Sequence, residues 1–320
     1  MIKFFNKEEG FKKINALGSA REPFLFIISY DKSKIYAKEL SKLDSTIFYN
    51  LEHHFTSCSK KVNLQKEPIN YTLYQKSFTR VIQEIQKGNT YLLNLTFPSK
   101  IKTPLSLKEI FIKANAPYKL LIDDSFVCFS PEKFIEIKEN TIATYPMKGT
   151  IDAGIANAKQ KILANQKELA EHTMIVDLMR NDLNMVASKT KVEKFRYIQK
   201  IQAGSKELLQ VSSKISATLD KNWHNYIGDI LDKLTPAGSI TGTPKKKTIE
   251  IIKEVEIANR GLYTGVFGVY DGVNLNSAVM IRAIAKQEGR LFYHSGGGIT
   301  LDSNPLEEYQ ELIDKIYIPV

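Results

Sequence analysis

The spacing of hydrophobic residues along the chain predicts a mixture of helices and strands. Apolar side chains recur every three or four positions between residues 74 and 87, which predicts an amphipathic helix that ends at Gly88. Helices are also predicted over residues 158–182, 248–257 and 305–316. The last two follow proline-containing turns, as helices often do.

Short runs of β-branched and aromatic residues, separated by turn residues, predict strands. They cover residues 24–28, 91–97, 119–122, 125–129, 134–138, 141–145, 263–270, 277–285 and 291–295. The runs between residues 119 and 145 are spaced like an antiparallel meander. Strands and helices do not alternate as in a doubly wound nucleotide-binding domain, so we expect an α+β fold.

Composition narrows the class of protein. Of the 320 residues, 43% are hydrophobic and 25% charged, which is typical of a globular chain. No apolar run reaches the roughly 18 residues that a membrane span needs, and the amino terminus lacks a signal-peptide pattern. We therefore expect a cytoplasmic protein without a membrane partner. Cys58 and Cys128 have no metal-ligand spacing and support neither a zinc site nor a disulfide framework.

The net charge of +10 raises the possibility of a nucleic-acid partner. However, only seven of the 45 basic residues are arginines, and the lysines are spread along the chain. Recognition of phosphates or bases usually favours clustered arginine. The composition therefore argues against nucleic-acid binding.

Two glycine-rich segments could bring the backbone close to a ligand. Residues 235–245 (TPAGSITGTPK) precede a predicted helix, where free amides favour anions, although such a segment can also be an ordinary loop. Gly296, Gly297 and Gly298 follow a predicted strand, and they indicate either close backbone packing or a tight turn.

Two pairs of glutamates have helical i,i+3 spacing. Glu168 and Glu171 form one pair, and Glu308 and Glu311 form the other, so each pair lies on one helix face. Four such carboxylates could hold Mg²⁺, whereas either pair taken alone is more typical of a solvated surface. Glu171 leads into the apolar segment 173–179, where a buried carboxylate would need a partner.

Lys148 stands at the end of a predicted strand, in the segment YPMKGT. Burial there would lower the pKa of its amine and make it a nucleophile near neutral pH. A surface lysine is the alternative reading of this residue.

In their order along residues 71–318, these segments resemble the chorismate-utilising enzymes. That family includes anthranilate synthase, aminodeoxychorismate synthase, and the isochorismate and salicylate synthases. The segments that carry the resemblance are SPE at 130–132, YPMKGT at 145–150, ELAEHTMIVDLMRND at 168–182, 236–245, 260–268, 281–282, 295–299 and DSNPLEEYQELIDK at 302–315. The resemblance implies antiparallel sheets packed in a sandwich with helices outside. It also implies a shortened N-terminal region over 1–68 that contributes strands, followed by a catalytic domain over 69–320.

The resemblance also implies roles for individual residues. Glu171 and Glu311 match the magnesium ligands of the family, and Glu168 and Glu308 match their supporting carboxylates. The groups that match the family's contacts to the carboxylates and side chain of chorismate are Gly149, Thr150, Tyr263, Arg282, Gly296, Gly297, Gly298 and Lys315.

Within the family, Lys148 favours an aminodeoxychorismate synthase, because typical anthranilate synthases have alanine there. The resemblance implies that Lys148 attacks the ring and that Glu132 is the general acid or base. Leu92 stands where water-adding members have a base lysine, which disfavours hydration. Gln210 replaces a family histidine that is linked to pyruvate elimination, which further disfavours anthranilate synthesis.

Neither cysteine lies in a glutaminase motif, so we expect ammonia from a separate glutamine amidotransferase subunit or from solution. We expect no tryptophan feedback and no fused lyase, because the matching segments are missing. An anthranilate synthase, or a non-catalytic relative that only binds an amidotransferase, remains as an alternative.

Overall fold

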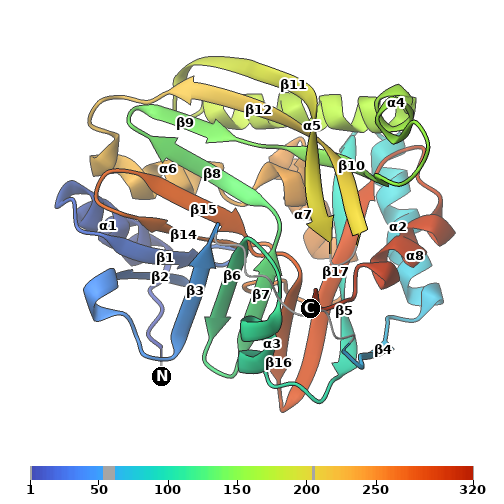
Figure 1. The fold of residues 1–320 in the computed structure, drawn as a ribbon, viewed down its shortest axis with the longest axis horizontal. Helices are drawn as coiled ribbons and strands as arrows, with labels where there is room; N and C mark the ends of the chain where they lie inside the picture. The colour runs from blue at the N-terminus through green and yellow to red at the C-terminus, as the bar shows by residue number, and fades with distance from the viewer. Residues whose placement is uncertain (1, 53–61, 204–205, 320) are drawn as a thin grey trace.

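The computed structural model describes residues 2–52, 62–203 and 206–319. Over these residues, two antiparallel sheets carry helices around them (Figure 1). The helices are α1 (Lys7–Ser19), α2 (Tyr71–Gln86), α3 (Leu107–Lys113), α4 (Ala158–Ala164), α5 (Gln166–Asn184), α6 (Ile227–Leu234), α7 (Lys245–Val255) and α8 (Pro305–Asp314). Short 3₁₀ turns are η1 (Leu40–Lys42), η2 (Trp223–Tyr226) and η3 (Gly238–Ile240). The expected α+β class is confirmed.

The first sheet has nine strands among the described residues, in the order β10-β12-β9-β8-β15-β14-β1-β2, and β11 pairs with β12. Its strands are β1 (Phe24–Ile28), β2 (Ile35–Glu39), β8 (Lys133–Lys138), β9 (Thr141–Thr144), β10 (Met147–Asp152), β11 (Ser188–Ala203), β12 (Lys206–Thr218), β14 (Val266–Tyr270) and β15 (Leu275–Val279).

The second sheet has eight strands within the same ranges, in the order β13-β5-β17-β16-β7-β6-β3, and β4 pairs with β5. Its strands are β3 (Ile47–Leu51), β4 (Gln65–Glu67), β5 (Leu92–Lys102), β6 (Tyr118–Ile122), β7 (Phe126–Ser130), β13 (Gly242–Thr243), β16 (Ala283–Gln287) and β17 (Arg290–Ile299). Strands from the N-terminal 68 residues therefore pair with strands from the rest of the chain in both sheets.

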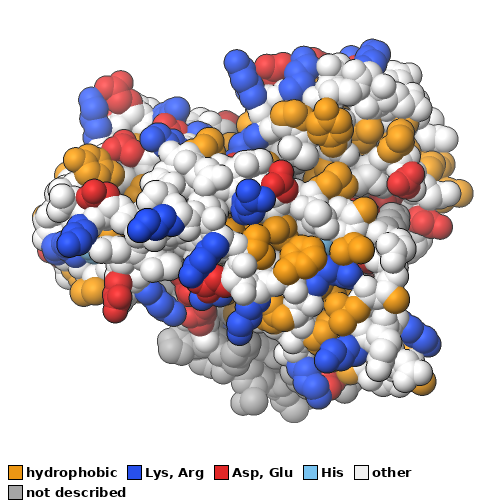
Figure 2. Space-filling model, turned by 90° about the horizontal axis from the view of Figure 1, so that it is seen from above, with side chains coloured by type: hydrophobic (Ala, Val, Ile, Leu, Met, Phe, Trp, Pro, Cys, Tyr) orange, Lys and Arg blue, Asp and Glu red, His pale blue; other side chains and the backbone are white. Residues whose placement is uncertain are grey.

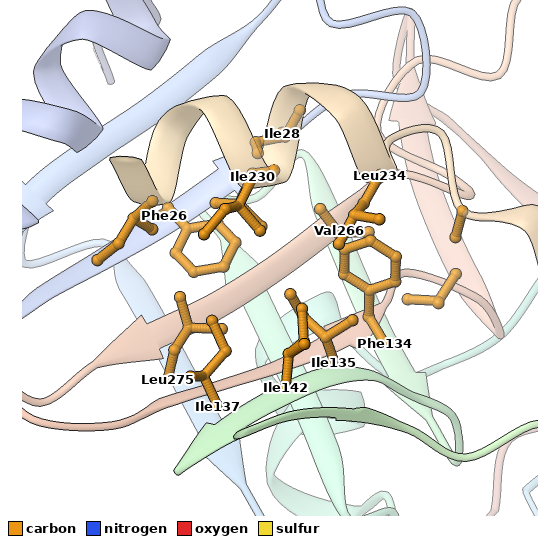
Figure 3. Close-up of a cluster of buried hydrophobic side chains, with 14 of the residues drawn as sticks. Phe26, Ile28, Phe134, Ile135, Ile137, Ile142, Ile230, Leu234, Val266 and Leu275 are labelled. Atoms are coloured by element: carbon orange, nitrogen blue, oxygen red, sulfur yellow. The ribbon is translucent and has the colours of Figure 1, made fainter. Parts of the chain in front are cut away.

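Alternation along β1 explains how the layers are joined. Leu25 and Ile27 pack with Leu120 and Cys128 of the second sheet, between the two sheets. Phe26, on the opposite face, packs in a cluster with residues of β8, β9, β14, β15 and α6 (Figure 3). A strand that is buried on both faces reads as a continuous apolar run, as FLFII does here.

Two predicted elements are each divided in the structure. The helix predicted over 158–182 is α4 and α5, because Asn165 is extended (φ −67°, ψ 113°) and its side chain caps α5. The strand predicted over 277–285 is β15 and β16, because Arg282 between them has a left-handed backbone (φ 53°). Periodicity alone does not detect a single residue that changes the backbone direction.

Helix α1 and the hairpin of β11 and β12 were not predicted. Most of β11 is exposed and polar, so its sequence lacks the apolar alternation of a half-buried strand. Figure 1 shows α5 running alongside this hairpin, and Arg196 and Ser213 of the hairpin link to α4 and α5.

Three features noted in the composition can be located in the structure, namely the charged residues, the apolar segments and Cys128. Figure 2 shows lysine and arginine side chains scattered among neutral and apolar ones on that face, without one dominant basic patch. Within the part of the chain that the structure describes, no helix is long and apolar enough to cross a membrane. Cys128 is a buried free thiol whose pKa is raised by burial, and Cys58 lies outside the described residues.

Candidate active site

Lys148 is presented by an irregular strand. Strand β10 pairs with β12, but the register shifts between Met147 and Thr150, which marks a bulge at Lys148 and Gly149. Gly149 has φ +86°, and a side chain there would meet the carboxylate of Glu168 at 3.1 Å. The bulge therefore requires glycine next to Lys148, and it brings β10 close to α5.

The ammonium of Lys148 forms an ion pair with Glu171 of α5. Lys148 Nζ lies 2.6 Å from Glu171 Oε2, and the side chains are 30% and 9% exposed. Burial opposes the charge on Lys148, but Glu171, with Glu168 and Glu311, outweighs burial and raises its pKa. The sequence-based expectation of a lowered pKa is therefore wrong for this state of the protein, because that expectation included burial and omitted the nearby carboxylates.

The start of α5 fixes the first pair of glutamates. The side chain of Asn165 accepts a hydrogen bond from the backbone N–H of Glu168 at 3.0 Å, as an N-cap does. His172, next to Glu171, is fully buried, and its Nε2 lies 2.7 Å from Ser213 Oγ of β12. Burial, together with Arg196 and Lys148, lowers the pKa of His172 to about 4, so its ring is neutral near pH 7. Nothing in the sequence singles out His172, because a single histidine in an apolar segment carries no local signal.

The three consecutive glycines form part of β17 rather than a turn. They pair with β5, where Gly296, Gly297 and Gly298 lie opposite Thr96, Leu95 and Asn94. A side chain on Gly297 would lie 3.2 Å from Glu308 Oε2 and 3.9 Å from both Glu311 Oε1 and Lys315 Nζ. A side chain on Gly298 would lie 3.8 Å from Leu92 Cδ1 and 4.0 Å from Lys148 Nζ. This stretch of β17 without side chains therefore lies between Lys148 on one side and Glu308, Glu311 and Lys315 on the other, close to both.

Helix α8 contributes the second pair of glutamates. Asn304 caps its first turn, and Ser303 Oγ donates to Glu308 Oε1 at 2.8 Å. At the other end, Lys315 Nζ lies 2.6 Å from Glu311 Oε1 and donates to Gly296 O at 2.8 Å. Burial lowers the pKa of Lys315, with Arg282 and Lys148 acting in the same direction and Glu311 opposing. The pKa of Lys148 is thus raised, whereas the pKa of Lys315 is lowered.

A cavity of about 430 Å³ opens beside Glu311 and Lys315, at the end of α8. Arg282 lines it, donates to the carbonyl of Lys315 at 2.9 Å and lies over the ring of Tyr317 at 4.8 Å. Neither Lys148 nor Glu171 lines the cavity. The cavity therefore lies next to Arg282, Glu311 and Lys315, and Lys148 and Glu171 lie outside its lining.

Glu132 lies between β7 and β8, and the hydroxyl of Ser239 donates a hydrogen bond to its carboxylate. Burial raises the pKa of Glu132, while Ser239 and the charge of Lys315 act against that rise. Ser239 lies in the glycine-rich segment 235–245, but its residue type and position there did not indicate a contact with Glu132. Tyr263 is buried with its ring 5.0 Å from the ring of His294.

Thr150 and Gln210 lie opposite each other on β10 and β12. Thr150 is exposed, so strand register rather than a side-chain contact places it near the site. The carbonyl oxygen of the Gln210 side chain is buried without a hydrogen-bond partner among the described residues. The structure thus brings most of the candidate residues together and leaves Thr150 at the edge.

The four glutamates offer carboxylate oxygens, which are the ligands that magnesium prefers. In the described ranges, no three Cys, His, Asp or Glu side chains are grouped closely enough to form a metal centre. Two of the carboxylates are instead paired with lysine, in the contacts Lys148–Glu171 and Lys315–Glu311. The four carboxylates therefore suit magnesium by residue type, but among the described residues they are not gathered into one centre, and Glu171 and Glu311 are each paired with an ammonium group.

The sequence as a whole matches known proteins. Residues 6–319 match the family of chorismate binding enzymes. The chain is 49% identical over 314 residues to the "Uncharacterized PabA-like protein" of Haemophilus influenzae, covering 97% of this chain and 96% of that protein. It is 33% identical to aminodeoxychorismate synthase component 1 of Bacillus subtilis, over 76% of this chain and 54% of that protein. The chain therefore spans about half the length of the Bacillus relative.

Among solved structures, the fold is similar to that of a 2,3-dihydroxybenzoate-specific isochorismate synthase from Bacillus anthracis. The TM-score is 0.70 at 19% identity, covering 95% of this chain and 87% of that one. The protein thus has the fold of the chorismate-utilising enzymes. The chain belongs to the chorismate binding enzyme family, which confirms the resemblance inferred from its motifs.

Proposed function

We propose that this chain is component I of an aminodeoxychorismate synthase. It would convert chorismate and ammonia to 4-amino-4-deoxychorismate, the precursor of 4-aminobenzoate and folate. The observation that carries this proposal is the position of the Lys148 amine, which lies 2.6 Å from Glu171 and beside the bare Gly298 backbone. The identity to aminodeoxychorismate synthase component 1 of Bacillus subtilis supports the same choice.

In the proposed reaction, the neutral amine of Lys148 attacks carbon 2 of the ring. The double bonds shift, and the hydroxyl on carbon 4 leaves as water with a proton from Glu132, whose raised pKa suits a proton donor. Ammonia then attacks carbon 4, and the double bonds shift back. The bond from carbon 2 to the positively charged Lys148 nitrogen breaks with its electron pair going to that nitrogen, so Lys148 leaves as a neutral amine. The ammonium formed on carbon 4 returns one proton to Glu132. The enolpyruvyl side chain is retained throughout.

We further propose that Glu171 and Glu311 hold Mg²⁺, with Glu168 and Glu308 in support. Magnesium, when bound, supplies positive charge for the ring carboxylate of the substrate. Arg282, Lys315 and the Gly296–Gly298 amides would bind the remaining anionic groups of chorismate, and Tyr263, Gly149 and Thr150 would complete the substrate site. Ammonia would come from a glutamine amidotransferase subunit.

One assay tests the reaction. The purified protein is incubated with chorismate, Mg²⁺ and an ammonium salt, and the products are identified by mass. Aminodeoxychorismate supports the proposal, whereas anthranilate with pyruvate identifies an anthranilate synthase and isochorismate a hydrating enzyme. Absence of turnover, with or without an amidotransferase, would leave only a binding role.

A further inference from the structure

Arg196 occupies a bulge in the edge strand β11. The register between β11 and β12 shifts between Lys194 and Tyr197, and Arg196 has a left-handed backbone (φ 49°). Positive φ is uncommon for a residue with a long side chain. A bulge of this kind redirects the side chain that it carries. Here it turns the guanidinium toward the helices beside the hairpin.

The guanidinium binds the end of α4. Arg196 NH1 donates to the carbonyl of Leu163 at 2.9 Å, and NH2 donates to the carbonyl of Ile162 at 3.1 Å. The last carbonyls of a helix have no partners within the helix, and a cation there is favourable. Helix α4 ends one residue before Asn165, which caps α5 at Glu168. Arg196 therefore fixes the corner from which α5 starts.

The same residue also reaches the second turn of α5. The backbone N–H of Arg196 donates to Ser213 Oγ at 2.9 Å, and Ser213 Oγ lies 2.7 Å from Nε2 of His172. His172 is fully buried and directly follows Glu171. Two separate contacts of Arg196 thus lie on either side of the turn that carries Glu168 and Glu171.

We propose that Arg196 is a positioning residue, which holds the α4–α5 corner so that Glu168 and Glu171 face Gly149 and Lys148. The Lys148–Glu171 distance of 2.6 Å leaves little room for displacement of α5. A displacement of about 1 Å at a reacting group can reduce a rate on the order of 100-fold. The consequence for catalysis rests on the proposed function, whereas the placement of α5 does not.

The test replaces Arg196 in a way that keeps its backbone conformation. Arg196→Gly tolerates positive φ and removes only the guanidinium, and Arg196→Lys retains a cation that can reach a carbonyl. Lys194→Ala, at an exposed neighbouring position on β11, is the matched control. Ser213→Ala removes the link to His172 and leaves the guanidinium contacts in place.

Three properties are measured for each variant: amide hydrogen exchange in residues 166–173, half-saturation by Mg²⁺ alone in calorimetry, and kcat with KM for chorismate. For Arg196→Gly we expect about 10-fold faster exchange in this segment and no comparable change in α2 or α7. The Mg²⁺ concentration at half-saturation should rise about 10-fold, which is typical of the loss of a group that orients metal ligands. The rate constant kcat should fall more than KM rises, with partial recovery in Arg196→Lys.

In the Arg196→Gly/Ser213→Ala double variant, the loss of free energy of Mg²⁺ binding should be smaller than the sum of the losses in the two single variants, because both residues act on the same turn. Unchanged exchange in 166–173 and unchanged Mg²⁺ binding in Arg196→Gly would overturn the proposal, even if the melting temperature fell. If the wild-type protein makes no aminodeoxychorismate, the proposed function fails, and the exchange data still decide whether Arg196 places α5.

Discussion

Lys148 on β10 and Glu171 on α5 form an ion pair with 2.6 Å between Nζ and Oε2. This pair joins the bulged strand that carries the candidate nucleophile to the helix that carries half of the candidate carboxylates. Burial of Lys148 favours the neutral amine, but the carboxylates outweigh burial and raise its pKa. A nucleophilic role therefore requires Lys148 to give up its proton and its pairing with Glu171 during the reaction.

Lys148→Ala should abolish amination and leave chorismate binding largely intact. Only the amine can form the proposed covalent bond, whereas Arg282, Lys315 and the glycine strand remain to bind the anion. The amination rate is measured with ammonium, and chorismate binding is measured by calorimetry. An undiminished rate in this variant would remove Lys148 from the mechanism.

Glu171→Gln should weaken the binding of Mg²⁺, because it replaces a charged ligand oxygen by a neutral amide. We expect the Mg²⁺ concentration that gives half-maximal rate to rise by at least about 10-fold. The measurement is the initial rate as a function of Mg²⁺ concentration, with the metal first removed by a chelator. Glu250→Gln, at an exposed position on α7, serves as the control. A titration curve like that of the wild type would refute the assignment of Glu171 as a ligand.

Glu132→Gln should abolish activity and should change how stability depends on pH. Burial raises the pKa of Glu132, although Ser239 and Lys315 oppose the rise. A carboxyl with a raised pKa in the folded state contributes stability below its unfolded pKa, and this contribution is lost as pH rises through the folded pKa. The neutral variant loses nothing as pH rises, so its melting temperature should gain on the wild type as pH rises from about pH 4, the unfolded pKa of glutamate, toward the raised folded pKa. A constant difference across this range would contradict the prediction.

Glu256→Gln should destabilise the fold by about 3–5 kcal/mol, because it leaves a buried charge without its partner. Arg260 and Glu256 are 2% and 4% exposed and pair at 2.6 Å. Arg260 also donates to the carbonyls of Ile240 and Asn94, so the pair holds the loop that contains Ser239 against β5. The free energy of unfolding is measured in urea. As the control, Glu8→Gln in the exposed pair with Lys12 should leave the free energy of unfolding unchanged within error. An equal loss of stability in both variants would contradict the prediction that the buried pair of Arg260 and Glu256 stabilises the fold.

The sequence predicted most of the elements because they depend on local patterns. The helix expected over residues 74–87 is α2, and the strands expected between 119 and 145 are β6 to β9. The motif order also identified the family, since residues 6–319 match it. Local patterns missed helix α1 and the hairpin of β11 and β12, whose outer strand is mostly polar. They also missed changes at single residues, such as the break at Asn165 and the left-handed Arg282, since one residue hardly alters a periodic signal.

The identity of the candidate residues was likewise determined by the sequence, because it follows from the residue types and their order along the chain. Only the tertiary structure decided their electrostatic state and their supports. The sign of the Lys148 pKa shift depends on Glu171, Glu168 and Glu311, which approach it through folding rather than through neighbouring positions. The contacts of Arg196 with α4 and Ser213 depend in the same way on a bulge in an edge strand. Burial and Coulomb interactions act through space, so a linear pattern does not contain their balance.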